Sequence, residues 1–145
     1  SSDLTKGRLR EEAGKSFLLY QTAGGLRALC TSHKAVATDE ETLNLMKRVC
    51  ADPLYVTLCK SQKCFRARLS PKPWRLQPPM HDENTDIRTG KDDPSEEWIE
   101  EYEQKSKLVR ACRLIEQIGP ENTDPTFLEA LHAHNSSVGT AERLA

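Results

Sequence analysis

Basic side chains and one tryptophan are concentrated near the middle of the sequence. Residues 59–76 carry six basic side chains and no acidic one. Lysine and arginine neutralise phosphates and release counterions, and an exposed tryptophan can stack on an unpaired base. The chemistry available here is contact with single-stranded nucleic acid or with an acidic protein surface. The candidate binding residues are Arg66, Arg68, Lys72, Trp74, Arg75 and, from an earlier segment, Arg27.

The charge of the chain is divided between its two halves. The formal net charge of the 145 residues is −1, yet residues 1–80 sum to +7 and residues 81–145 to −8. Ten acids lie between residues 82 and 103, against two basic residues. Such a division indicates either a basic binding surface or two surfaces that attract each other, within one chain or in a homodimer. In the second case Trp74 would be part of the core and the arginines would meet the acidic segment.

The cysteines offer little support for catalysis or metal binding. Five cysteines are scattered through the sequence, which predicts reduced thiols in a cytoplasmic protein rather than a disulfide framework. The close pair Cys59 and Cys64 lacks a second pair or a well-spaced histidine, so we expect no metal and no cofactor. A thiol-dependent enzyme would have to use Cys59 or Cys64 with His33 or His81.

The elements that hold these residues begin with a hairpin. Residues 16–22 and 26–31 are two β-prone runs separated by Ala23-Gly24-Gly25. This pattern predicts a β-hairpin, because adjacent glycines reach positive φ without strain. Thr38 followed by Glu41 predicts a capping box and a helix, and Asp52-Pro53 predicts the start of a second one.

The basic residues are expected on a third strand. Residues 64–70 alternate apolar and basic side chains, with Arg66 and Arg68 on one face. The two prolines of 70–75 then predict a polyproline-like exit carrying Trp74.

The acidic half is expected to be helical. Residues 77–92 are expected to form a linker or mobile loop. The pattern of residues 93–118 predicts one long helix, which starts at Asp93-Pro94 and ends at Gly119-Pro120. Asp124-Pro125 starts a short helix, and the chain is expected to fray from Asn135.

The predicted fold is α+β. A small antiparallel sheet, made of the hairpin and the basic strand, is packed by helices and followed by a C-terminal long helix and a short helix. Residues 1–76 form a basic α+β part, 77–92 the linker, and 93–145 an acidic helical part that packs on the first, giving one compact domain.

The hairpin carries a family resemblance. Residues 22–29, Thr-Ala-Gly-Gly-Leu-Arg-Ala-Leu, resemble the Thr-x-x-Gly-Gly-x-His-Leu hairpin of archaeo-eukaryotic-type primase-polymerase domains. In that family the histidine contacts nucleotide phosphate, and an upstream strand supplies metal-binding carboxylates. Here the histidine position falls at Arg27 or Leu26, and the N-terminal residues hold no such pair. The resemblance therefore implies a binding platform without polymerase chemistry.

The leading functional hypothesis is a non-catalytic, nucleic-acid-associated module. The alternative is a protein-interaction or structural domain in which the basic strand and the acidic helix pair within or between chains. A thiol-dependent enzyme comes third. No apolar run approaches 18 residues and residues 1–8 are polar, so we expect neither a membrane span nor a secretory signal.

Overall fold

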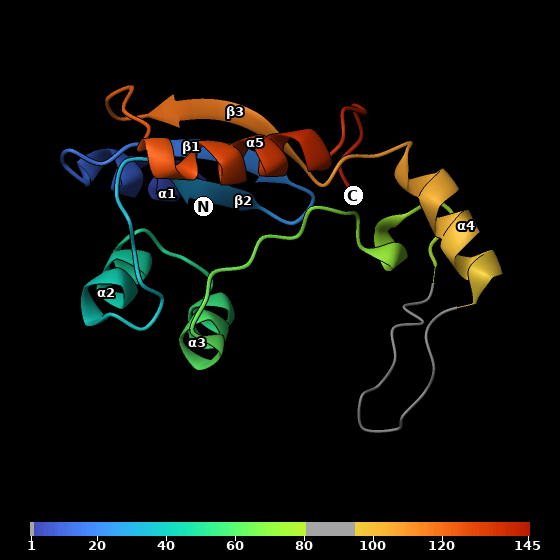
Figure 1. The fold of residues 1–145 in the computed structure, drawn as a ribbon, viewed down its shortest axis with the longest axis horizontal. Coiled ribbons are helices and arrows are strands. Elements are labelled where there is room, and N and C mark those ends of the chain that lie inside the picture. Colours follow the sequence, from blue (N-terminus) through green and yellow to red (C-terminus); the bar gives the residue numbers. More distant parts are fainter. Residues whose placement is uncertain (1, 81–94) are drawn as a thin grey trace.

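The computed structural model describes residues 2–80 and 95–145 (Figure 1). Within these ranges five α-helices and three β-strands form, with two short 3₁₀ turns. The helices are α1 (Ser2–Glu11), α2 (Glu40–Arg48), α3 (Pro53–Gln62), α4 (Glu96–Ser106) and α5 (Leu128–Ser137). The strands are β1 (Phe17–Thr22), β2 (Leu26–Cys30) and β3 (Cys112–Ile118), and the turns are η1 (Pro73–Arg75) and η2 (Pro125–Phe127). The chain is an α+β protein, as the sequence predicts.

The sheet is antiparallel, with strand order β2-β1-β3. The predicted hairpin is confirmed: Phe17 pairs with Cys30, and the amide of Thr22 donates to the carbonyl of Gly25 at 2.8 Å. A register shift between Leu19 and Tyr20 interrupts the pairing of β1 with β3.

A helix covers each face of the sheet. Leu9 of α1 packs with Phe17, Leu19 and Ile118 on one face. On the other face Val138, just after α5, packs with Tyr20, Ala111 and Cys112 (Figure 1). In Figure 1 α3 and α4 lie to the side of the sheet, whereas Val49 at the end of α2 packs against the cluster on the α1 face. No helix within residues 2–80 and 95–145 is long and apolar enough to cross a bilayer.

The third strand comes from a different part of the chain than expected. The predicted long helix over 93–118 is wrong: α4 ends at Ser106, and residues 112–118 are β3. The helix-like spacing of Val109, Cys112 and Ile115 misled the prediction, because the free edge of β1 supplies a pairing partner that outweighs local propensity. The acidic half therefore contributes a strand to the same sheet as the hairpin.

The predicted basic strand over 64–70 is also wrong. These residues are extended but pair with no strand of the described chain, and side chains from other elements bind their carbonyl groups. Alternation here does not bury an apolar face, since Phe65 and Leu69 are both exposed. The alternating pattern correctly predicts an extended backbone. It does not tell whether another strand is available to pair with that backbone.

Two of the expected helix starts are confirmed. Asp52 accepts a hydrogen bond from the amide of Leu54, and Asp124 accepts one from Thr126, each at 2.9 Å. Asp93-Pro94 and most of the predicted linker lie outside the described residues, and α4 is capped by Ser95, which accepts from Trp98 at 3.2 Å.

The other expectations for the chain outside the sheet are wrong. The predicted Thr38 capping box does not form, since the N-cap of α2 is Asp39 without a side-chain cap. The expected fraying from Asn135 is absent as well, because Ala145 is buried and the chain around Leu144 bridges Arg110.

Candidate nucleic-acid interface

Residues 64–75, here called the basic segment, run from the end of α3 to η1 as an extended chain (Figure 1). Side chains from separate elements anchor its backbone. Tyr55 of α3 donates to the carbonyl of Arg66 at 2.8 Å and accepts from its amide at 3.3 Å. Arg27 of β2 and Tyr102 of α4 donate to the carbonyls of Arg68 and Pro71, at 2.8 and 2.7 Å. Hydrogen bonds from side chains thus replace strand pairing in fixing the path of the segment.

Arg66 and Arg68 differ in the hydrogen bonds that their guanidinium groups make. Both Arg66 and Arg68 are exposed. Arg68 folds back on its own chain, with Nε 3.0 Å from the carbonyl of Ser70 and Nη2 3.3 Å from that of Pro71. The guanidinium of Arg66 makes no hydrogen bond or ion pair within the described residues. Two of the Arg68 nitrogens are thus occupied, whereas all donors of the Arg66 guanidinium are without a partner among residues 2–80 and 95–145.

Trp74 lies outside the core, which contradicts the interpretation that it is a core residue. Trp74 is 49% exposed, while Pro73 directly before it and Leu76 two residues after it are buried. Lys72 lies over the ring, with Nζ 5.5 Å from the ring centroid. The exit is therefore held by a proline and a leucine, and it presents the indole to solvent beside a cation.

The core beneath the exit is filled by other side chains. Leu76, Met80 and Val109 form a buried cluster, against which Trp98 and Tyr102 of α4 pack. These two rings stack, with centroids 5.3 Å apart and an interplanar angle of 4°. The aromatic side chains that pack against this cluster therefore come from α4, and Trp74 is not among them.

Arg75 brings the end of the basic segment to the hairpin turn. A Cβ built on Gly24 would lie 3.1 Å from Nη2 of Arg75, so a glycine at this position leaves room for the guanidinium. Arg143 donates to the carbonyl of Arg75 at 3.1 Å. The basic end of the segment therefore includes Arg143, a cation that the sequence did not single out because its segment was expected to fray.

Arg27 differs from the other predicted binding residues because its guanidinium points into the protein. Nη1 lies 3.0 Å from Nε2 of His134 and 3.4 Å from Sγ of Cys112, and Nη2 donates to Arg68. With these donors occupied, Arg27 is a support of the basic segment rather than part of its outer surface.

The ion pairs of the described residues leave the basic segment unpaired. They join Arg10 to Glu116, Lys15 and Arg48 to Glu12, and Lys105 to Glu101. The last pair lies within α4, and no ion pair among the described residues joins an acid of this helix to the basic segment. In residues 2–80 and 95–145 the charge of the segment is not neutralised by the chain itself.

One cluster combines residue types that occur in thiol catalysis. Cys112 Sγ lies 3.9 Å from Nε2 of His134, whose Nδ1 lies 3.0 Å from Oδ1 of Asn135. Cys112 is 1% exposed, and burial raises the pKa of its thiol, against the opposing charge of Arg27. A nucleophile must be an accessible thiolate. This thiol is enclosed and held in its protonated form.

The sequence could not find this cluster, since Cys112 was placed on a helix and Asn135 in a frayed end. Of the cysteines that it did single out, Cys59 is buried and Cys64 is half-buried, and neither has a described hydrogen bond to a histidine. The pairing of Cys59 or Cys64 with His33 is therefore not found, and His81 lies outside the described residues. Cys50 is exposed.

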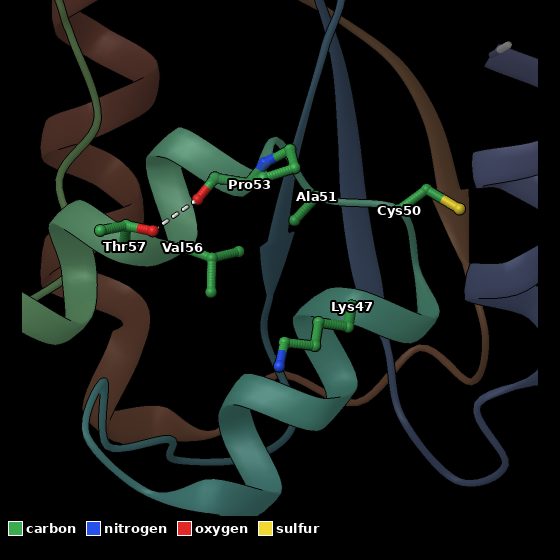
Figure 2. A pocket seen from close by; sticks show the side chains of 6 residues that line it. All are labelled: Lys47, Cys50, Ala51, Pro53, Val56 and Thr57. Carbon is green, nitrogen blue, oxygen red and sulfur yellow. Dashed lines mark hydrogen bonds between the residues drawn. The ribbon is translucent and has the colours of Figure 1, made fainter.

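A separate hollow lies between α2 and α3 (Figure 2). It measures about 510 Å³ and is lined by Lys47, Cys50, Ala51, Pro53, Val56 and Thr57. Thr57 donates to the carbonyl of Pro53 at 3.0 Å, as Figure 2 shows, and the Cys50 thiol points away from these residues. The lining contains no acid–base pair. The described part of the chain also contains no group of three His, Cys, Asp or Glu that could hold a metal ion.

Comparison with known proteins adds no relative: no family model, curated protein or solved structure matches the chain. The resemblance of the hairpin to primase-polymerase domains stays a prediction.

Proposed function

We propose that the protein is a nucleic-acid-associated module that binds a single strand along the basic segment. Phosphates would contact Arg66, Arg68, Lys72 and Arg75, and a base would stack on Trp74. Arg27 supports this surface from within, and Arg143 extends it toward the hairpin turn.

The observation that carries the proposal is the position of Trp74. A large aromatic ring, 49% exposed and next to Lys72, lies on a backbone fixed by hydrogen bonds from three other elements. An anchored backbone reduces the ordering entropy that a flexible basic tail would lose on binding. Cations without an acid partner in the described chain are available for phosphates.

An acidic protein surface is the alternative partner, since the same cations would bind carboxylates. Aromatic stacking favours nucleic acid, because an acidic peptide gains less from an exposed indole than an unpaired base does. Among the described ion pairs, Arg10 with Glu116 joins the two halves of the chain, but none joins the basic segment to α4. All five cysteines are free thiols, which suits the cytoplasmic location that we include in the proposal.

The test is binding of a fluorescein-labelled oligo-dT and oligo-U of about 15 nucleotides at low salt, measured by anisotropy. The double variant Arg66→Ala with Arg68→Ala should lose at least about 10-fold in affinity, since each charged contact contributes about 1 kcal/mol or more. Arg8→Ala with Lys34→Ala is the matched control: it removes the same charge from exposed positions outside the basic segment.

Three outcomes would contradict the proposal. Wild-type protein could fail to bind either oligonucleotide at low salt. The Arg66 and Arg68 variant could bind as tightly as the Arg8 and Lys34 control. Poly-glutamate of matched length could compete as well as unlabelled oligonucleotide, which would identify the acidic protein surface as the better ligand.

A further inference from the structure

Arg27 connects the core to the basic segment, and its two terminal nitrogens have different partners. Nη1 contacts Nε2 of His134 and Sγ of Cys112, both on the α5 side of the sheet. Nη2 donates to the carbonyl of Arg68, at the middle of the basic segment. No carboxylate among the described residues forms an ion pair with this guanidinium. The orientation of the guanidinium therefore depends on neutral acceptors.

The hydrogen bonds around His134 have a fixed direction. Arginine has donors only, so Nε2 of His134 must be the acceptor and Nδ1 must carry the proton. Nδ1 then donates to Oδ1 of Asn135 at 3.0 Å, and the same oxygen accepts from the hydroxyl of Tyr20 at 2.5 Å. Burial raises the pKa of Tyr20, which keeps this hydroxyl a donor.

Packing holds the same groups in place. Tyr20 is 2% exposed and His134 is 7% exposed, and their rings meet edge to face with centroids 4.8 Å apart. Tyr20 and Arg27 are also directly paired across β1 and β2. The imidazole therefore has one orientation, and it presents its lone pair to Arg27.

We infer that Arg27 and His134 are positioning residues for the proposed strand-binding function, acting through the carbonyl of Arg68. This inference rests on the proposed function. His134 orients the guanidinium, the guanidinium holds the Arg68 peptide, and the peptide sets where the cations of the basic segment lie. Neither residue contacts a phosphate, so their loss changes affinity without changing the number of counterions released on binding.

Two substitutions at His134 separate the acceptor from the rest of the side chain. The amide oxygen of glutamine reaches the place of Nε2, so His134→Gln keeps an acceptor for Arg27. The amide nitrogen of asparagine reaches the place of Nδ1, so His134→Asn keeps the donor to Asn135 and loses the acceptor. Both variants keep a neutral polar side chain, and thermal unfolding records whatever stability each has lost.

Affinity for the labelled oligo-dT is measured across a salt series for both variants. The affinity of His134→Asn should fall by about 3- to 10-fold, which corresponds to the loss of one hydrogen bond. The affinity of His134→Gln should stay within about 3-fold of wild type. The slope of log K against log salt should equal that of wild type in both. By contrast, Arg66→Ala should lower the slope by about 0.7.

Trypsin cleavage of the free protein gives a readout that needs no nucleic acid. Release of the Arg68 carbonyl should expose the peptide bonds after Arg66 and Arg68, so His134→Asn should be cut there several-fold faster than His134→Gln.

The inference is overturned if the two variants bind and are cut alike, or if affinity follows melting temperature rather than the acceptor. A changed salt slope in either variant would also overturn it. If wild type binds and Arg66→Ala weakens binding, these results leave the proposed function standing. If wild type does not bind at all, the proposed function fails, and the inference fails with it.

Discussion

Trp74→Leu is the substitution that separates base stacking from charge at the proposed interface. Alanine is a poor choice, because about half of an indole of roughly 250 Å² is covered. At about 25 cal/mol per Å², its removal would cost up to about 3 kcal/mol of folding free energy. Leucine keeps much of this apolar contact, and it offers no aromatic face to a base.

The expected loss follows from the energy of stacking. Base–aromatic stacking contributes about 1–3 kcal/mol per base, so Trp74→Leu should lower affinity for oligo-dT by about 5- to 150-fold. Trp74→Phe keeps an aromatic face and should stay within a few-fold of wild type. The salt slope should stay the same in both, because neither substitution removes a charge.

Anisotropy of the labelled oligonucleotide measures affinity, and indole fluorescence shows the contact itself. Trp98→Phe leaves Trp74 as the single tryptophan and keeps an aromatic ring against Tyr102. In this background the oligonucleotide should quench the emission of Trp74. The reasoning is refuted if folded Trp74→Leu protein binds as tightly as wild type, or if binding leaves the emission unchanged.

Three further substitutions test the supports of this surface and the core. Tyr55→Phe removes both hydrogen bonds to the basic segment and should lower affinity about 3- to 10-fold with an unchanged salt slope; an unchanged affinity would show that this anchor is dispensable. The Arg48 side chain lowers the pKa of Glu12 by hydrogen bonding, so this pair stabilises the fold above pH 4.5 and the effect is lost as the pH falls through the lower folded-state value. Glu12→Gln should therefore cost about 1 kcal/mol of unfolding free energy at pH 7, and the gap should close in acid; a gap independent of pH would contradict this. In a thiol titration exposed Cys50 should react fast and Cys50→Ser should remove that phase, while buried Cys112, whose thiol pKa burial raises, should react only on unfolding.

Local signals in the sequence were enough for the hairpin and for two helix starts. A short connection joins the two β-prone runs, although neither Gly24 nor Gly25 adopts the positive φ that the prediction invoked. Asp52 and Asp124 each cap a helix just before a proline. In each case the deciding contacts lie within a few residues along the chain, so composition and spacing are sufficient.

The third strand could not be predicted in the same way. Residues 112–118 form β3 because β1 has a free edge, and that edge lies about 90 residues earlier in the sequence. Residues 64–70 have the better strand pattern, yet the side chains of Tyr55 and Arg27, instead of a neighbouring strand, bind their peptide groups. Pairing between distant segments decides which of them becomes a strand, and local propensity carries no information about such pairing.

The site shows the same division between local and distant contacts. The sequence indicated the cations of the basic segment and Trp74, because they are neighbours along the chain. It could not indicate that Arg27 faces inward or that His134 orients it, since these contacts join β2 to α5. The supporting network is a product of the fold, whereas the surface is a product of the local sequence.

The salt dependence of oligonucleotide binding tests the central claim most directly. Phosphate contacts by Arg66, Arg68, Lys72 and Arg75 predict a slope of log K against log salt of about −3, at roughly 0.7 per contact. The double variant of Arg66 and Arg68 to alanine should reduce the slope to about −1.5. A slope near zero, or the same slope in wild type and double variant, would contradict the assignment of the basic segment as a nucleic-acid-binding surface.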